Sequence, residues 1–346
     1  MTTGRKNLTK AICFAKPDHL PVHIEVNFNW LHEKDPKKQK QINTLIEKIP
    51  EDMIVRGYHA TISDDMVDPD GNRCWNDEWN VGWIDDGHGA RAISHPLESG
   101  YDLLDGYSFP KAGVDRWFDS ARGCFAEEPN KFWIGTVWFT LFERLWMLRG
   151  FNNMLMDPYI NNAEFIYLRD RIVDFSLVQI ESWAKYNADA VYFSDDWGSQ
   201  RSLLMNPDDW RIFYKPAYEK LFRKVRDNGM KVFMHLCGNV VEIIPDLIEI
   251  GLDVLNPVQP QAMDIKELSD RFGGKLCFYG GIDVQGTMIL GTPDDVRKEI
   301  NNLVDLFGRF NGGYICSTSH SIMPETPLDN IIAMFEAIKD IKYYAK

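Results

Sequence analysis

A regular alternation of short apolar runs with amphipathic segments restricts the fold of this chain more than any other pattern. The strand-like runs from residue 130 onward are "FWIGTVWF" (132–139), "ADAVYFSD" (188–195), "KVFMHLC" (231–237), "DVLNPV" (253–258), "KLCFYGGID" (275–283) and "GGYICST" (312–318). Two earlier runs, "LPVHIEVNF" (20–28) and "DMIVRGYH" (52–59), raise the number to eight. Repeated strand–helix units favour parallel strands covered by helices, so we expect a (β/α)8 barrel, with an open doubly wound sheet as the alternative. No GxGxxG or GxxxxGK[ST] motif follows a strand, which weakens a nucleotide-binding form of that alternative.

Helix-start signals stand between these runs. Asn206 precedes Pro207 and two aspartates, and Thr292 precedes Pro293 in the same arrangement, which is typical of capped helix N-termini. Thr326, Pro327 and Asp329 nearly repeat the pattern. We therefore interpret residues 1–346 as one barrel domain.

Residues 60–130 do not fit the alternation. They contain Trp75, Trp79 and Trp83 at intervals of four, but Asn, Gly and Asp are too frequent there for a helix. The segment predicts an aromatic-rich loop or small hairpin inserted over the mouth of the barrel. It is either a surface insertion packed by its own aromatic side chains or a lid over the substrate.

Composition and charge indicate which partners and which cellular location are expected for this chain. With 51 Asp and Glu against 38 Lys and Arg, the formal charge is −13, which disfavours nucleic acid as a partner. The chain begins without a secretory h-region, and its longest apolar run, "FWIGTVWFTLF", is too short to span a membrane. The six cysteines are scattered without a CxxC, which indicates free thiols or metal ligands in a cytoplasmic protein.

His235 and Cys237 lie two apart where a predicted strand ends, so both side chains point to the same side of the strand. The apolar Val232, Met234 and Leu236 alternate with them and are expected to face the helices. A packed histidine beside a small cysteine is the simpler interpretation. A metal site gains support because Cys316 lies near the end of another predicted strand and His320 lies four residues further on. Zinc accepts thiolate sulfur and imidazole nitrogen.

The stretches "AICFAKPDHLPV", "HLCGN", "YGGID", "GTPDDVRKEI" and "PETPLDNIIAM" resemble, in this order, the uroporphyrinogen-decarboxylase superfamily. That superfamily is built on a (β/α)8 barrel and contains decarboxylases and zinc-dependent methyltransferases that act with corrinoid proteins. The methyltransferase branch has HxC on one strand and a third ligand shortly before a "PxTPxxN" helix start. The resemblance implies that His235 and Cys237 bind Zn²⁺.

The third ligand departs from the family pattern. Counting back from "PETPLDN" reaches His320 where the family has cysteine, whereas the nearby cysteine is Cys316. We favour His320 and keep Cys316 as the alternative. Gln259 stands where some relatives have a carboxylate near the metal, and is taken as a contact to the substrate or metal.

Other strand ends offer acidic and aromatic side chains. Asp195 and Asp196 are candidates for a general acid, for partners of a metal-bound imidazole, or for a helix cap. Asp283 ends the run "YGGID" and is a third catalytic candidate. The substrate-binding candidates are Trp197 as a platform for a flat ring, Tyr279 as a donor to a phenolic oxygen, and Trp79 and Trp83 from the insertion.

The resemblance implies a methyltransferase that acts with a separate corrinoid (cobalamin) protein, and the tryptophans of the predicted mouth segments favour an aromatic substrate. We therefore expect transfer of a methyl group from an aryl methyl ether to the Co(I) of that protein. A true decarboxylase is disfavoured because "VHIEVNFNWLHEKDP" lacks the arginines that would hold a tetrapyrrole's carboxylates. Methyl transfer from the corrinoid to a thiol such as coenzyme M, a zinc-free lyase, and a silent corrinoid- or tetrapyrrole-binding subunit remain as alternatives.

Overall fold

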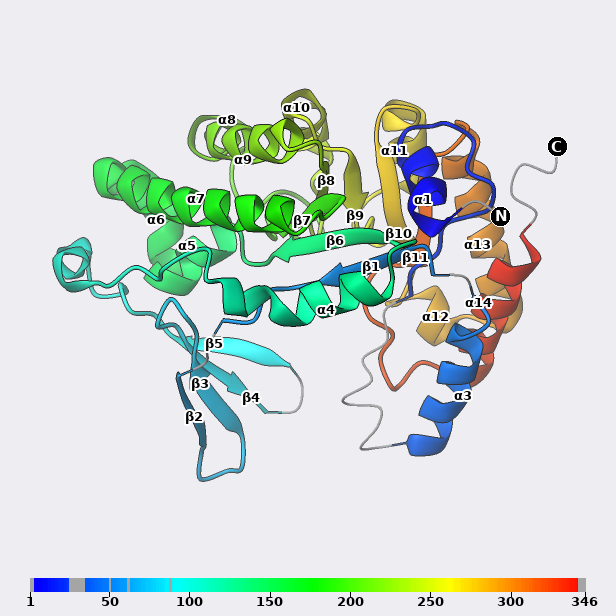
Figure 1. Ribbon diagram of the computed structural model, residues 1–346, viewed down its shortest axis with the longest axis horizontal. Helices are drawn as coiled ribbons and strands as arrows, with labels where there is room; N and C mark the ends of the chain where they lie inside the picture. The colour runs from blue at the N-terminus through cyan, green and yellow to red at the C-terminus, as the bar shows by residue number, and fades with distance from the viewer. Residues whose placement is uncertain (1–2, 25–34, 50, 61–62, 87–88, 342–346) are drawn as a thin grey trace.

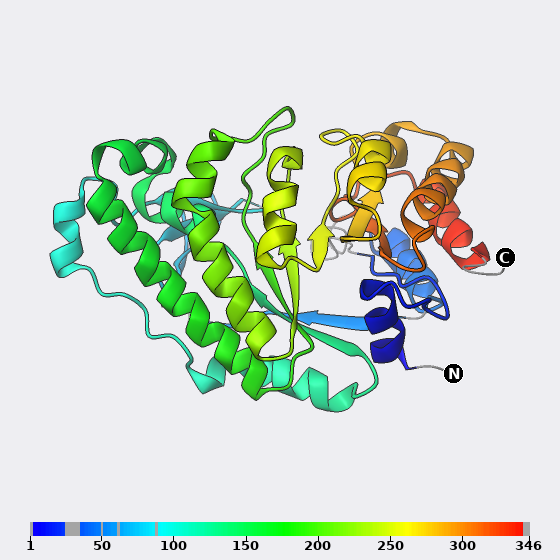
Figure 2. The same ribbon diagram turned by 90° about the horizontal axis from the view of Figure 1, so that it is seen from above.

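The computed structural model describes residues 3–24, 35–49, 51–60, 63–86 and 89–341. Seven strands form one curled parallel sheet in the order β1-β6-β7-β8-β9-β10-β11 (Figures 1 and 2). Their bounds are β1 Met53–Arg56, β6 Phe132–Val137, β7 Ala190–Ser194, β8 Lys231–His235, β9 Val254–Asn256, β10 Cys277–Ile282 and β11 Tyr314–Thr318. Each of the seven predicted runs from residue 52 onward contains one of these strands.

The segment predicted as the eighth strand, residues 20–28, begins beside β11. Val22 forms a parallel bridge with Cys316, and the backbone N–H of Cys316 donates to the Pro21 carbonyl at 2.9 Å. The predicted strand over 20–28 therefore begins where expected, and its residues 25–28 lie outside the described part of the chain. Together these contacts confirm the expected (β/α)8 type of fold.

Helices return the chain from each strand to the next on the outside of the sheet. In chain order, the covering helices are α3 Pro36–Ile46, α4 Asp119–Glu127, α7 Asn162–Lys185, α9 Lys215–Asp227, α10 Ile244–Ile250, α11 Ile265–Phe272, α13 Pro293–Gly308 and α14 Leu328–Asp340. Shorter helices lie in the connections: α5 Phe142–Arg149, α6 Phe151–Ile160, α8 Pro207–Phe213 and α12 Thr287–Leu290. None of the helices in the described ranges is long and apolar enough to cross a membrane.

The predicted caps hold for two of three helices. The Asn206 side chain accepts from the Asp208 N–H at the start of α8, and Thr292 forms a reciprocal capping box with Asp295 at the start of α13. Helix α14 differs, because it begins after Pro327 without a side-chain cap.

Two separate apolar clusters form the core. Val232, Met234 and Leu236 belong to the larger one, between the strands and the helices. Phe233 belongs to a smaller cluster inside the barrel. This separation confirms the predicted alternation along β8, and it places the side chain of His235 on the interior side.

Helix α1 (Gly4–Ile12) closes the barrel at the N-terminal ends of the strands. Its Leu8 and Ile12 pack in the interior cluster with Met53 and Phe132, which lie at or next to the first residues of β1 and β6. Because apolar side chains fill this end, chemistry is left to the opposite, C-terminal ends.

The insertion is larger than a small hairpin. It forms an antiparallel sheet, β2 Ser63–Val67, β3 Arg73–Asn76, β4 Gly82–Asp85 and β5 Ala90–Ser94, which projects from the barrel (Figure 1). Trp75 and Trp83 are directly paired across β3 and β4. The four-residue spacing of the tryptophans therefore reflects a tight turn between two strands, with Asn80 at a positive φ of 57°.

Candidate active site

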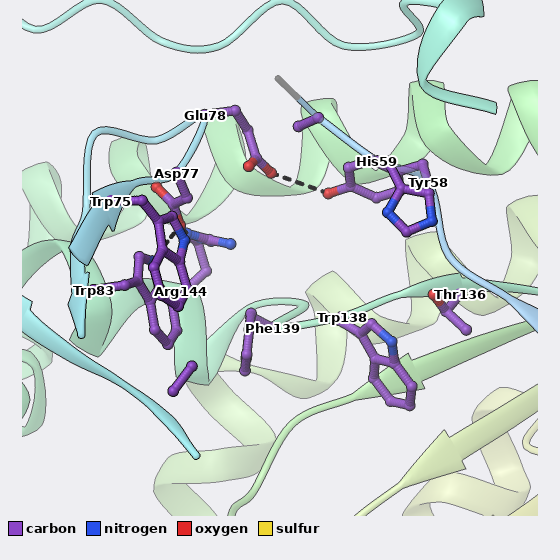
Figure 3. Close-up of a pocket in the computed structure, with 12 residues that line it drawn as sticks. Tyr58, His59, Trp75, Asp77, Glu78, Trp83, Thr136, Trp138, Phe139 and Arg144 are labelled. Carbon is purple, nitrogen blue, oxygen red and sulfur yellow. Dashed lines mark hydrogen bonds and ion pairs between the residues drawn. The ribbon is translucent and has the colours of Figure 1, made fainter. Parts of the chain in front are cut away.

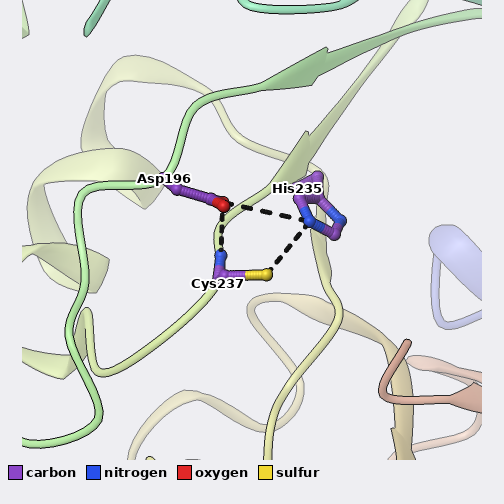
Figure 4. A group of neighbouring side chains, drawn as sticks. All are labelled: Asp196, His235 and Cys237. Atoms are coloured by element: carbon purple, nitrogen blue, oxygen red, sulfur yellow. Dashed lines mark hydrogen bonds and ion pairs between the residues drawn. The ribbon is translucent and has the colours of Figure 1, made fainter. Parts of the chain in front are cut away.

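Three potential metal ligands meet at the C-terminal ends of β7 and β8. One side-chain ligand atom from each of Asp196, His235 and Cys237 lies within 4.8 Å of the other two (Figure 4). Cys237 Sγ is 3.2 Å from His235 Nε2, which is 3.9 Å from Asp196 Oδ1. We call these residues the rim triad. Among the described residues, no other group of His, Cys, Asp and Glu side chains meets this criterion.

The ring of His235 is oriented by Asn256 at the end of β9. His235 Nδ1 is 2.7 Å from Asn256 Oδ1, while Asn256 Nδ2 donates to the carbonyl of Tyr279 at 3.0 Å. Since the Asn256 amide nitrogen is used as a donor, its oxygen must accept, and the proton of the neutral imidazole lies on Nδ1. The lone pair of Nε2 is therefore directed toward Cys237, as a metal ligand requires.

The loop after β8 fixes Cys237. Its backbone N–H donates to Asp196 Oδ1 at 2.9 Å, and the next N–H, of Gly238, donates to Gln259 Oε1 at 2.5 Å. Gly238 has a φ of +81°, and a Cβ there would come 2.4 Å from the backbone of Gly198, so glycine is required. Gln259 is thus a support for this loop.

The electrostatic surroundings disfavour a bare thiolate. Burial, followed by the negative charges of Asp196 and Glu143, raises the pKa of the Cys237 thiol. A bound cation would reverse this effect, because it favours the thiolate.

The two candidates for a third ligand are placed differently. The His320 ring is exposed, and its centroid lies 6.3 Å from that of His235 at 72°. Cys316 is fully buried in the larger core cluster and forms a parallel bridge with Val22. The structure therefore brings His320, and not Cys316, beside the rim triad.

The adjacent aspartates have separate surroundings. Asp195 is fully buried, and its carboxylate accepts from the N–H groups of Phe142 and Glu143 at 2.7 and 2.6 Å and from the Tyr218 hydroxyl. It caps the first turn of α5, whereas Asp196 belongs to the rim triad. The helix-cap interpretation thus applies to Asp195, though the helix is α5 and not the one that follows it in sequence.

Glu143 lies at the site, although it was not among the residues predicted from the sequence. Its carboxyl accepts from Ser194 Oγ at 3.1 Å. Burial, and then the charges of Asp195 and Asp196, raise its pKa to about 9. Burial also raises the pKa of Asp195 to about 7. The only sequence signal was a carboxylate in the apolar stretch "WFTLFERLW" just after a strand end.

Three other predicted residues are buried behind the rim. Asp283 accepts from the N–H groups of Gln285 and Gly286 and so holds its own turn. The Tyr279 hydroxyl lies 2.5 Å from His23 Nδ1, inside the barrel. Trp197 is fully buried against Trp210 and Tyr218 and offers no face to a substrate. All three side chains are at most 3% exposed.

A cavity of about 300 Å³, which we call the aromatic cavity, lies between the antiparallel sheet and the barrel (Figure 3). Trp75 and Trp83 stack at 6.3 Å on one side, and Trp83 lies 5.4 Å from Phe139. Its aromatic lining residues are Tyr58, Trp75, Trp83, Trp138 and Phe139. The volume and the flat apolar walls suit one substituted ring.

Trp138 connects the aromatic cavity to the rim triad. It lines the cavity, and its ring lies 6.2 Å from the His235 ring in an edge arrangement. Trp79, by contrast, is only 2% exposed and packs 4.9 Å from Phe175 beneath the cavity. Of the two tryptophans predicted from the insertion, Trp83 lines the cavity and Trp79 supports it.

A barrel with a thiol, an imidazole and a carboxylate gathered at its C-terminal rim is the architecture of an α/β-barrel enzyme. The chain belongs to the uroporphyrinogen decarboxylase (URO-D) family, whose model matches residues 139–341.

Individual relatives agree with this assignment. The uroporphyrinogen decarboxylase of Chlorobium phaeobacteroides is 26% identical over 199 residues, which are 55% of this chain and 52% of the relative. That of Nostoc punctiforme is 24% identical over 193 residues, 56% and 51% of the two chains. The chain thus spans about half the length of the curated relatives it matches. A methyltransferase from Methanosarcina mazei shares the fold, with a TM-score of 0.69 at 17% identity over 98% and 99% of the two chains.

Proposed function

We propose that the protein is a methyltransferase that takes a methyl group from an aryl methyl ether and passes it to the Co(I) of a separate corrinoid protein. The observation that carries the proposal is the rim triad beside the aromatic cavity, with Trp138 shared between them. The C–O bond would break with its electron pair left on the phenolic oxygen, while Co(I) supplies the pair for the new C–Co bond.

The rim triad fits zinc. Sulfur, imidazole nitrogen and carboxylate oxygen are ligands that zinc accepts, and Asn256 already directs His235 Nε2 into the group. His235, Cys237 and Asp196 would hold the ion, and His320, whose ring centroid is 6.3 Å from that of His235, offers a further imidazole. When bound, zinc would supply Lewis-acid stabilisation of the negative charge that develops on the ether oxygen.

The chain's own residues would supply position and a proton. The stacked indoles of Trp75 and Trp83 would hold the ring, and Trp138 would place its ether group toward His235. Glu143 is a carboxyl group near the triad whose pKa burial raises to about 9, so it can carry a proton. It would serve as proton donor to the leaving oxygen, in place of the predicted Asp195, whose carboxylate is occupied by α5 and Tyr218.

A decarboxylase is the second candidate, because the uroporphyrinogen decarboxylases of Chlorobium phaeobacteroides and Nostoc punctiforme are relatives of this chain. Binding a tetrapyrrole with many carboxylates calls for several free cationic side chains. In the aromatic cavity the arginine is Arg144, and it is paired with Asp77 at 2.6 Å. This pairing favours the methyltransferase.

Metal analysis of the purified protein tests the ligand set. We expect one zinc per chain, a large loss of zinc in Cys237→Ala, and no loss in the matched control Cys13→Ala, whose cysteine is exposed. His320→Ala should lower zinc content while Cys316→Ala retains it. Full zinc occupancy in Cys237→Ala would contradict the assignment, and a loss of zinc in Cys316→Ala but not in His320→Ala would make Cys316, and not His320, the further ligand.

Methyl transfer tests the reaction. The zinc-loaded protein should convert free cob(I)alamin and 2-methoxyphenol to methylcobalamin and catechol in equal amounts, followed by the visible spectrum. Methylcobalamin consumption by a small thiol, without any reaction of the ether, would instead support thiol methylation. Inactivity in both assays with a normal zinc content would overturn the proposal.

A further inference from the structure

We infer that the aromatic cavity selects aryl methyl ethers whose ring carries no carboxylate, and that its charge arrangement rejects benzoates. The inference rests on the proposed function, since it names the substrate class of the same site. It follows from three charged side chains that line the cavity: Asp77, Glu78 and Arg144.

Arg144 is not available to a substrate anion. Its Nη1 donates to Asp77 Oδ2 at 2.6 Å, and the two side chains are only 5% and 12% exposed. The guanidinium also packs over the rings of Trp79 and Phe139, at 5.3 and 5.7 Å. An arginine with a buried carboxylate partner is already neutralised, so a second carboxylate gains little from it.

Glu78 is a second carboxyl group near Arg144, whose guanidinium is already paired with Asp77. Its Oε1 accepts from the Tyr58 hydroxyl at 3.2 Å across the cavity wall (Figure 3). Burial raises the pKa of this carboxyl, so it can hold a proton and donate to a neutral phenolic oxygen. In its ionised form it repels a carboxylate. Either state favours an uncharged substituent.

Besides Arg144, His59 is the side chain of the cavity lining that can carry a positive charge, and it does not change the balance of charge. It is exposed at the mouth, where an ion pair with a substrate carboxylate is weakened by water. A ring carboxylate placed deeper, among Trp75, Trp83 and Phe139, would be desolvated without a partner. We expect this to weaken binding by about 100-fold.

Calorimetric titration of the zinc-loaded full chain near neutral pH tests the inference with two probes that differ by one carboxylate. These probes are 2-methoxyphenol and 4-hydroxy-3-methoxybenzoate. The phenol should bind about 100-fold more tightly than the benzoate. Glu78→Gln keeps an acceptor for Tyr58 and removes the acid, so it should reduce the ratio of the two dissociation constants by about 10-fold. The control Glu127→Gln, at an exposed position of α4, should leave this ratio unchanged.

Equal or tighter binding of the benzoate would overturn the inference and leave the methyltransferase proposal standing. If the ratio of the dissociation constants of the two probes is unchanged in Glu78→Gln, Glu78 does not cause the selectivity, and the charge argument is overturned. Because these titrations need no corrinoid, a selective cavity without methyl transfer would instead count against the proposed reaction. Failure of both probes to bind would overturn both proposals.

Discussion

At the scale of single residues, hydrogen bonds decide which atoms of the rim triad face one another. Asn256 Oδ1 also accepts from the Tyr192 hydroxyl at 2.5 Å, so this one oxygen connects β7, β8 and β9. A histidine whose second nitrogen is held in this way has a defined tautomer and little rotational freedom. The readiness of the triad for a metal therefore depends on a residue that touches no metal itself.

Asn256→Ala should weaken zinc binding by about 10- to 100-fold, because the His235 ring loses the acceptor that orients it. Competition with a coloured zinc chelator measures the affinity. Asn301→Ala, on the exposed face of α13, is the matched control. An unchanged zinc affinity in Asn256→Ala would show that β8 alone orients the histidine.

At the scale of elements, the first turn of α5 is held by a carboxylate from another strand end. Helix N-termini present unpaired N–H groups, and Asp195 accepts two of those of α5 from the end of β7. The same helix carries Glu143 and Arg144, which belong to the rim and to the aromatic cavity. Asp195 is therefore a positioning residue for both parts of the site.

Asp195→Ala should lower the free energy of unfolding by about 3 kcal/mol, because it leaves buried N–H groups and the Tyr218 hydroxyl without their acceptor. Urea denaturation followed by circular dichroism measures this change. Asp294→Ala, near the N-terminus of α13 and exposed, should cost less than about 1 kcal/mol. Equal effects for the two variants would contradict the capping role.

At the scale of the whole molecule, the site forms where two sheets approach each other. Helix α1 closes one end of the barrel, and the antiparallel sheet supplies Trp75 and Trp83 near the other. Trp79 anchors this sheet: it packs on Phe175 of α7, and its carbonyl accepts from the Tyr107 hydroxyl at 2.6 Å. The insertion is thus attached through Trp79 and presents its other two tryptophans to the cavity.

Substitution by alanine should have different effects at the buried Trp79 and at Trp75, which lines the aromatic cavity. Trp79→Ala removes a large buried side chain and should destabilise the protein by about 4 kcal/mol. Trp75→Ala should leave the melting temperature nearly unchanged and weaken the binding of 2-methoxyphenol at least about 10-fold, because it removes one wall of the cavity. Thermal denaturation and calorimetry separate the effects, and a stable Trp79→Ala variant with unchanged binding would contradict this division.

Local patterns in the sequence were sufficient for the barrel, for the inward side of β8 and for placing His235 and Cys237 together at a strand end. Strand periodicity, proline-led helix starts and an HxC at a strand end each depend on neighbouring residues alone. The roles of Asp195, Glu143, Asn256 and Arg144 depend on partners at least 21 residues away in the chain. Such pairings arise only when strand ends and the insertion meet in space, so tertiary structure had to decide which aspartate caps a helix, which lies at the rim and which tryptophans face the cavity.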